Sequence, residues 1–203
     1  MPATTTSADT AAESECAPRR GRPRSAGVDE ALLTATLELA TEVGINRMSM
    51  DVLAQRVGVS KATIYRRWPS KEALVLDALQ HAIKPFDQVD TGTFRGDLDV
   101  YLGELAERMA NGSASDILPH LIEVSVRDEV LRASLDDYIR MRRQPLRAII
   151  ERAIARGELP ADTDVDILLD VILSPFIYRR LLSHEVIDDD FVRRLVALVL
   201  PGI

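Results

Sequence analysis

A chain of 203 residues with 46% hydrophobic residues and a net charge of −7 is long and apolar enough to form one or two small domains with buried cores. Its composition excludes several classes, since no run of about 18 apolar residues could span a membrane. The N-terminus lacks the apolar segment of a secretory signal. The single cysteine, Cys16, excludes a disulfide framework and a multi-cysteine metal site. We therefore expect a protein of a reducing compartment such as the bacterial cytoplasm.

Charge is distributed unevenly along the chain. The net charge is +1 over residues 1–27, 0 over residues 28–84 and −8 over residues 85–203. Basic residues gather locally at residues 19–24 and 61–71. Because screening limits the reach of a charge to roughly 8–10 Å, DNA responds to such clusters rather than to the total charge. A basic head on an acidic body is typical of a protein whose head alone contacts DNA.

Residues 1–26 are rich in Ala, Thr, Ser and Pro and almost lack large apolar side chains, which predicts a disordered arm. The arm ends at residues 19–24 in RRGRPR, which resembles the core of an AT-hook. Such a narrow strip can place Arg20, Arg22 and Arg24 in an A·T-rich minor groove. The alternative is a flexible basic arm that makes loose phosphate contacts. Both interpretations place the arm on DNA.

The segment at residues 49–68, SMDVLAQRVGVSKATIYRRW, has the pattern of two short helices joined by a tight turn. Ser49 and Ser60 are placed to cap the helices, and Gly58 supplies the positive φ that the turn needs. No acidic residue occurs in residues 52–71, so the second helix carries only positive charge. This pattern predicts a helix-turn-helix, which presents its second helix to the major groove of DNA. The alternative is an ordinary helical hairpin with a basic face.

Two further helices are predicted to flank this hairpin. The spacing of apolar residues favours one helix over residues 28–43, ended by Gly44. Pro69 ends the basic helix, and the next helix begins at a Ser70 cap and runs to about Ile83. Trp68 is expected to be buried as a core plug beneath this three-helix head, with base stacking as the alternative.

The rest of the chain has helical periodicity. Helices are predicted near residues 98–109, 115–126 and 128–155, the last kinked or divided by Pro145 and bearing a solvated arginine face paired with acids. Apolar residues cover more than one face of the two final helices, which indicates a surface covered by a second copy of the chain. The alternative is a thick monomeric core. The residues expected at the dimer surface are Leu168, Leu169, Ile172, Phe176, Phe191, Leu195 and Val199.

No catalytic pattern is present in the sequence. The three histidines are widely separated, and no HExxH, GxSxG or phosphate-binding glycine loop occurs. Asp162, Asp164 and Asp166 have the spacing of calcium-loop ligands, but Ile167 stands where that loop needs glycine and Leu173 where it needs glutamate. We therefore expect no enzyme, no metal and no cofactor.

The strings GVSKATIY at residues 58–65 and PSKEAL at residues 69–74 resemble the DNA-binding head of the tetracycline-repressor (TetR/AcrR) regulators. The resemblance is close over residues 28–79 and extends to the rest of the chain only in layout. Many members have Tyr or His followed by Phe before the Pro-Ser-Lys string, whereas this chain has RRW. The resemblance implies an all-α fold of about nine helices, with a helix-turn-helix head and a helical body for ligand binding and dimerisation.

This resemblance implies three units, namely the arm at residues 1–26, a DNA-binding domain at residues 27–83 and a ligand-binding and dimerisation domain at residues 84–203. It also implies base contacts from the start of the basic helix and phosphate contacts around it, with Arg67 preferred to Arg66 for phosphate. The DNA contacts expected in the head are Ser49, Ser60, Lys61, Ala62, Thr63, Tyr65, Arg66, Arg67 and Lys71.

The function implied is that of a homodimeric transcriptional regulator, a repressor that a small-molecule effector releases from a near-palindromic DNA operator. The effector pocket is expected at Tyr101, Leu105, Met109, Leu118, Ile122, Tyr138 and Met141. One alternative is an effector-independent DNA-binding protein that acts in chromosome organisation or through a protein partner. Another is a helical enzyme with an incidental hairpin.

Overall fold

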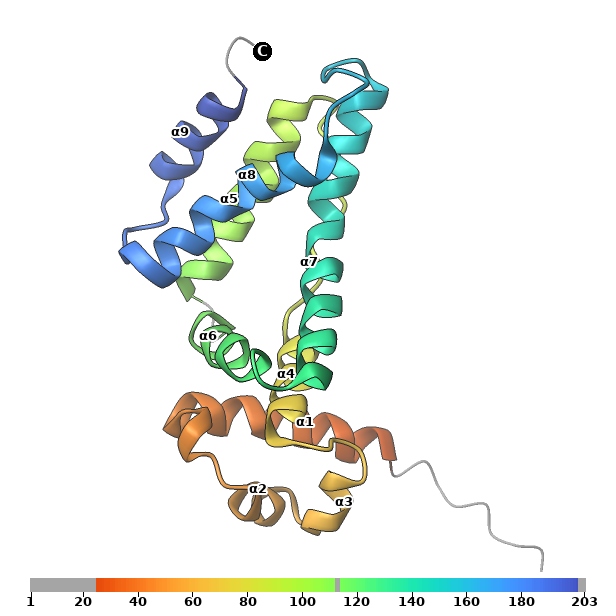
Figure 1. The fold of residues 1–203 in the computed structure, drawn as a ribbon, viewed down its shortest axis with the longest axis vertical. Coiled ribbons are helices and arrows are strands. Elements are labelled where there is room, and N and C mark those ends of the chain that lie inside the picture. The colour runs from red at the N-terminus through yellow and green to blue at the C-terminus, as the bar shows by residue number, and fades with distance from the viewer. Residues whose placement is uncertain (1–24, 112–113, 201–203) are drawn as a thin grey trace, which may run out of the picture.

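The computed structural model describes residues 25–111 and 114–200, and within these ranges it is helical with no strand (Figure 1). The predicted all-α fold is confirmed. The helices are α1 (Ser25–Val43), α2 (Met50–Val57), α3 (Lys61–Tyr65), α4 (Lys71–Ala82), α5 (Phe94–Asn111), α6 (Ala114–Ser125), α7 (Glu129–Ala155), α8 (Val165–Tyr178) and α9 (Asp189–Val199). A 3₁₀ turn at Ile45–Arg47 and a π-helical turn at Arg179–Ser183, termed η2, complete the set. In the described ranges, no helix combines the length and the apolar composition that crossing a bilayer requires.

The first helix begins earlier than the apolar spacing predicts. It starts at Ser25 rather than at residue 28, because the small residues at positions 25–27 carry no apolar periodicity that would reveal the extra turn. The predicted arm at residues 1–26 therefore loses its last two residues to α1. The rest of that arm, with Arg20, Arg22 and Arg24, lies outside the described residues.

Local signals place the ends of the helices in the N-terminal part. Gly44 (φ 79°) directly follows α1, and Gly58 (φ 74°) ends α2 in the left-handed region. The side chains of Ser49, Ser60 and Ser70 accept hydrogen bonds from backbone N–H groups in the first turns of α2, α3 and α4. The predicted caps and turns are thus confirmed.

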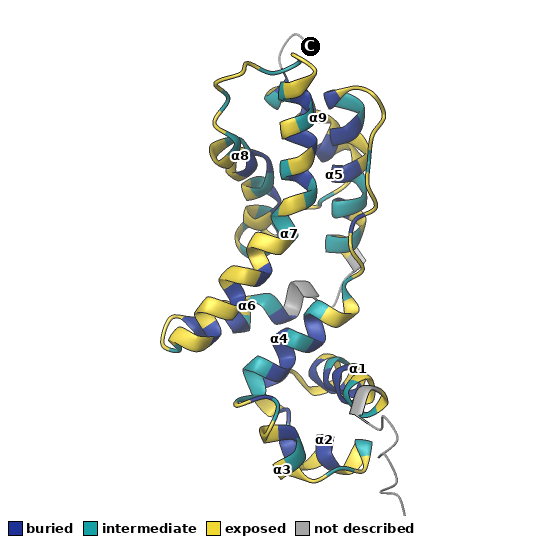
Figure 2. Cartoon of the chain, turned by 90° about the vertical axis from the view of Figure 1, so that its right-hand side faces the viewer, coloured by how far each residue is buried: buried dark blue, intermediate teal, exposed yellow. Residues whose placement is uncertain are grey.

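Two hydrophobic cores hold the described residues together, as the buried residues in Figure 2 show. The first core joins α1–α4 to α6 and the first half of α7, and it includes Ile64 and Leu121. The second core joins α5, the second half of α7, α8 and α9, and it includes Leu146 and Ile172. The long helix α7 contributes to both cores. Pro145 was expected to kink or divide this segment; it lies inside α7, which runs through it as one helix and is therefore not divided.

Helix α4 connects the helix-turn-helix to the rest of the molecule (Figure 1). It packs against α1 on one side and against α6 and α7 on others. Leu74, Val75 and Ala78 of α4 are completely buried in the first core. Because these contacts are close-packed, a displacement of α6 or α7 has to be accommodated by α4.

Helix α6 turns one apolar face to the core and another to the surface. Ile117 and Leu121 are buried, as predicted. Ile122 and Val126 were expected inside, but they are 39% and 77% exposed. Ile122 is displaced by about 100° around the helix from the buried Leu121, and Val126 follows the end of α6 at Ser125.

Candidate nucleic-acid interface and ligand cavity

The short helix α3 is held in place by one apolar side chain. Ile64 is fully buried in the first core. The side chains of Lys61, Ala62, Tyr65 and Arg66 are exposed around it. Because burial of Ile64 fixes the rotation of the helix, these four side chains are available to a groove of DNA.

The first turn of α3 is fixed by Ser60. Its Oγ accepts a hydrogen bond from the backbone N–H of Thr63 at 3.1 Å and lies 2.9 Å from the Thr63 hydroxyl oxygen. In the same way, the Oγ of Ser49 accepts a hydrogen bond from the backbone N–H of Asp51 at 3.2 Å. Both serines thus cap helices in the free protein, and their contacts to DNA stay predictions.

Acidic side chains compensate two of the cations in the head. Lys61 forms an ion pair with Asp51 of α2 at 3.0 Å, and Arg67 pairs with Asp29 of α1. Arg66 is exposed and makes no ion pair within the described ranges. Asp29 neutralises Arg67 within the protomer. The contacts of both arginines to DNA, including the sequence-based preference for Arg67 at a phosphate, stay predictions. Sequence reasoning missed both acids, because neither lies at a helical spacing from its cation.

The connection from α3 to α4 is fastened on two sides. The Lys71 ammonium donates a hydrogen bond to the carbonyl oxygen of Ile45 at 2.7 Å, which ties the start of α4 to the turn after α1. Trp68 is 8% exposed and donates its indole N–H to Asp77 of α4 at 2.7 Å. The predicted burial of Trp68 is confirmed. A phosphate contact from Lys71 would have to compete with the Ile45 carbonyl.

A cavity of about 1110 Å³ lies between the two cores. Its wall is built from α1, α4, α5, α6, α7, α8 and η2, and apolar side chains make up most of it. Of the residues expected at an effector pocket, those that line the cavity are Tyr101, Leu105, Met109, Leu118 and Tyr138. Ile122 and Met141 do not line it, and they are 39% and 50% exposed instead, because they lie on the outer faces of α6 and α7.

A cluster of rings and guanidinium groups forms one part of the cavity wall. The rings of Phe86 and Tyr101 lie 4.5 Å apart between centroids. The guanidinium carbons of Arg108 and Arg142 lie 4.1 and 5.0 Å from the centroid of the Phe86 ring. Both arginines also contact the carbonyl oxygen of Lys84, at 2.5 and 3.4 Å. Sequence reasoning placed Tyr101 at the pocket but missed Arg142, because it assigned the arginines of α7 to a solvated face, and it did not consider Phe86 or Arg108.

Two buried phenols lie beside this cluster. Burial raises the pKa of Tyr101 to about 12 and also raises the pKa of Tyr138, while the nearby charge of Arg142 opposes both shifts. Both hydroxyl groups are therefore protonated at neutral pH and can donate hydrogen bonds.

Most of the side chains expected at a dimer surface lie inside the protomer instead. Leu169, Ile172 and Phe176 are at most 1% exposed, and Phe191 and Leu195 are buried with them in the second core. Leu168 and Val199 are only partly buried against that core, and their place at a dimer surface stays a prediction. The apolar spacing revealed that these helices are covered, but the cover on this side is α5 and α7 of the same chain.

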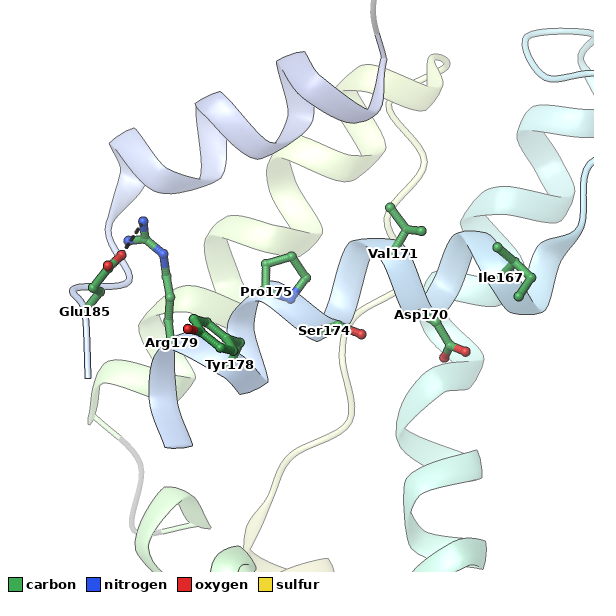
Figure 3. A pocket seen from close by; sticks show the side chains of 8 residues that line it. All are labelled: Ile167, Asp170, Val171, Ser174, Pro175, Tyr178, Arg179 and Glu185. Atoms are coloured by element: carbon green, nitrogen blue, oxygen red, sulfur yellow. Dashed lines mark ion pairs between the residues drawn. The ribbon is translucent and has the colours of Figure 1, made fainter. Parts of the chain in front are cut away.

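The opposite face of α8 is exposed and forms a shallow groove (Figure 3). Ile167, Val171 and Tyr178 lie along it and are 59%, 51% and 59% exposed. At one end of the groove, Arg179 forms an ion pair with Glu185 at 2.9 Å (Figure 3). This exposed apolar groove is termed the α8 face.

An all-helical chain whose cationic α3 is held outward by a capped turn defines a helix-turn-helix DNA-binding protein. Comparison with known proteins identifies the family. A family model described as "Bacterial regulatory proteins, tetR family" matches residues 32–78, and one described as "Tetracyclin repressor-like, C-terminal domain" matches residues 88–199. The chain belongs to the TetR family of transcriptional regulators.

Relatives match along most of their length. The chain is 32% identical over 187 residues to the uncharacterized HTH-type transcriptional regulator YdeS of Bacillus subtilis, covering 91% of this chain and 94% of YdeS. It is 36% identical over 191 residues to the DNA-binding transcriptional repressor TetR of Mycobacteroides abscessus, covering 90% and 97%. Among solved structures, the TetR family transcription regulator SCO0332 superposes with a TM-score of 0.73 at 32% identity, covering 87% and 98%.

A more distant structure, FadR of Bacillus subtilis in complex with stearoyl-CoA, superposes with a TM-score of 0.65 at 16% identity. The superposition covers 85% of this chain and 98% of the FadR chain. This likeness supports the fold.

Proposed function

We propose that this regulator is a homodimeric repressor that binds a near-palindromic operator and leaves it when a small molecule fills the cavity. The observation that carries the proposal is the shared wall of the cavity. Leu37 of α1, Leu79 of α4 and Ile83, which directly follows α4, line it together with side chains of α5–α8. A ligand there would touch the helix to which Trp68 ties the end of α3.

The proposed mechanism is a shift between two arrangements of the head. A ligand that fits the cavity better when α4 is displaced would favour that arrangement, and α3 would move with α4. The affinity for DNA would fall only if the ligand binds the DNA-incompetent arrangement more tightly. The cavity volume of about 1110 Å³ is slightly above the range of about 300–1000 Å³ that is common for small-molecule sites, so the cavity has room for a ligand of drug size or larger.

The α8 face is the proposed contact with the second copy. Its exposed apolar side chains are large, and pairing the same face on both chains would cover them. Two heads joined in this way would reach successive major grooves, with half-sites roughly 34–36 Å apart. Base contacts from Lys61, Ala62 and Thr63 and minor-groove or phosphate contacts from the arm complete the proposed interface.

The proposed domain division keeps residues 27–83 for DNA and residues 84–203 for ligand binding and dimerisation. The gap between the two family models, from residue 78 to residue 88, supports this boundary. The name of the M. abscessus relative supports repression, and the stearoyl-CoA complex of B. subtilis FadR is an instance of a ligand bound by this fold. A regulator of this kind would act in the bacterial cytoplasm, where its operator lies.

Selection of bound fragments from random DNA tests the proposal. We expect an inverted repeat whose two halves are about one helical turn apart. A single, unrepeated site bound by one chain would contradict the homodimer. Small molecules are then screened for release of the selected fragment. If compounds bind the cavity and none releases DNA, the alternative of an effector-independent DNA-binding protein replaces the proposal.

A further inference from the structure

The cavity wall carries more positive than negative charge, although the chain as a whole is acidic. The charged side chains that line it are Lys84, Glu107, Arg108, Arg142, Arg143, Asp170 and Arg180. Arg143 is neutralised within the wall by Asp170 at 2.7 Å, and Arg108 is neutralised from outside it by Glu104. These pairs leave the wall with an excess of positive charge.

Arg142 differs from these two arginines. It makes no ion pair within the described ranges and is half-buried. Its guanidinium contacts the carbonyl oxygen of Lys84 at 3.4 Å, and its central carbon lies 5.0 Å from the centroid of the Phe86 ring. A guanidinium that is partly removed from water and lacks a carboxylate is a strong site for an anion, because its planar N–H groups match a carboxylate in a bidentate geometry.

The surroundings of Arg142 suit an anionic head rather than a bare ion. Two buried phenols, Tyr101 and Tyr138, line the same cavity as Arg142, and Tyr138 precedes Arg142 by one turn of α7. Each phenol can donate one hydrogen bond to an oxygen. Beyond this cluster the wall is apolar, with Leu105 and Phe176 among its members. A polar group at one place and a long apolar wall elsewhere call for an amphiphilic ligand.

We infer that the cavity selects an organic carboxylate with a large apolar body, and that Arg142 is the residue that binds the carboxylate. The inference rests on the proposed function of the cavity as the effector site and adds the chemical class of the ligand. On binding, the carboxylate replaces the long contact between Arg142 and the Lys84 carbonyl. Because Lys84 follows the end of α4, the exchange frees one of the two arginine contacts at that end.

Two sets of probes test the charge preference at matched shape. Decanoate is compared with 1-decanol and decyltrimethylammonium, and 2-naphthoate is compared with 2-naphthol, by isothermal titration calorimetry on the full-length protein. For at least one of the two apolar groups, decyl or naphthyl, we expect the carboxylate to bind about tenfold more tightly than the alcohol, or better. The decyl cation should bind most weakly.

Variants of α7 assign the preference to one side chain. Arg142→Gln should abolish the advantage of the carboxylate, and Arg142→Lys should restore part of it. Arg140→Gln removes the same charge from the same helix outside the cavity, where Arg140 pairs with Asp137, and it should keep the advantage. Thermal melting shows that each variant is folded before titration.

The outcomes separate this inference from the proposed function. Equal binding of acid and alcohol, binding of neither carboxylate, or an unchanged preference in Arg142→Gln would overturn the inference. Release of the selected operator is followed in parallel by fluorescence anisotropy. Carboxylate binding that depends on Arg142 but leaves DNA bound supports the inference and contradicts the proposed function. Release of the operator by 1-decanol with no charge preference would support the proposed function and contradict the inference.

Discussion

The indole N–H of Trp68 donates a hydrogen bond of 2.7 Å to the carboxylate of Asp77, which joins the segment after the recognition helix to the middle of α4. Trp68 is buried and Asp77 is half-buried, so the bond is largely shielded from solvent. Shielding strengthens the bond and raises the cost of leaving either group unpaired. The position of α3 is therefore coupled to that of α4.

Removal of the indole donor should destabilise the head. Trp68→Phe keeps an aromatic plug but leaves the Asp77 carboxylate without its donor, and we expect the free energy of unfolding to fall by about 1–3 kcal/mol. Asp77→Asn is the matched control, because its amide oxygen still accepts the indole N–H. Urea denaturation followed by circular dichroism measures both variants. Equal loss in the two variants would contradict a specific role for the indole donor.

Substitutions on α3 should divide into two kinds. Lys61→Ala removes a proposed base contact and should change the preference at one base pair by about 1–3 kcal/mol. Arg66→Ala removes a proposed phosphate contact and should weaken binding to all sequences alike, with the slope of log affinity against log salt reduced by about 1. Fluorescence anisotropy on the selected operator and on singly changed sites measures both effects.

Two variants control for these effects. Arg67→Ala should change the salt slope less than Arg66→Ala, because Arg67 is already paired with Asp29. Arg140→Ala, on the outer face of the body, should leave DNA binding unchanged. A larger effect on the slope from Arg67→Ala than from Arg66→Ala would contradict this expectation and support the sequence-based preference for Arg67.

Local chemistry explains which features could be predicted from the sequence. The caps at Ser49, Ser60 and Ser70 and the turn at Gly58 depend on neighbours within a few residues, so the sequence contains the whole cause. The burial of Trp68 followed from its place after a short basic helix.

Features that depend on distant partners could not be predicted. The pair of Arg67 with Asp29 joins two helices whose relative position the sequence does not state. Periodicity showed that α8 is apolar on more than one face. However, a period gives only the direction of a side chain around the helix and does not say which part of the protein packs against it. Ile172 was therefore assigned to the dimer surface and lies in the core, whereas Val171 beside it is exposed.

A buried carboxylate holds the segment before α5 to the end of α7. Asp97 is fully buried and accepts hydrogen bonds from the Thr91 backbone N–H at 2.6 Å and from the Thr91 hydroxyl at 2.9 Å. Arg156 and Arg152 contact its other oxygen at 3.2 and 3.5 Å. Burial alone would raise the pKa of Asp97, but the hydrogen bonds from Thr91 and Arg156 outweigh it and hold the pKa below the ordinary value of 3.8.

The lowered pKa fixes the sign of a pH dependence. The stabilising contribution of Asp97 is complete above pH 3.8 and is lost as the pH falls through the still lower pKa of the folded protein. Asp97→Asn should lower the free energy of unfolding at pH 7 by about 2–4 kcal/mol, and the difference from the unsubstituted protein should shrink below about pH 4. Urea titrations at several pH values measure it. Asp99→Asn, exposed on the same helix, should change little, and a difference for Asp97→Asn that stays constant with pH would contradict the assignment.

The α8 face should decide the oligomeric state. Val171→Glu places a charge in the middle of the proposed contact, and the two copies would bring like charges together with no counterion. We expect a loss of about 3 kcal/mol or more in association, which is about 100-fold in the dissociation constant, because buried like charges are poorly solvated. Val130→Glu is the control, since Val130 is 70% exposed at the start of α7 and lies off this face. Light scattering coupled to size exclusion should find one chain per particle for Val171→Glu and two for Val130→Glu. A Val171→Glu variant that stays dimeric would place the interface on another surface. A monomeric variant that still binds a single half-site would show that the DNA-binding head folds without the second copy of the chain.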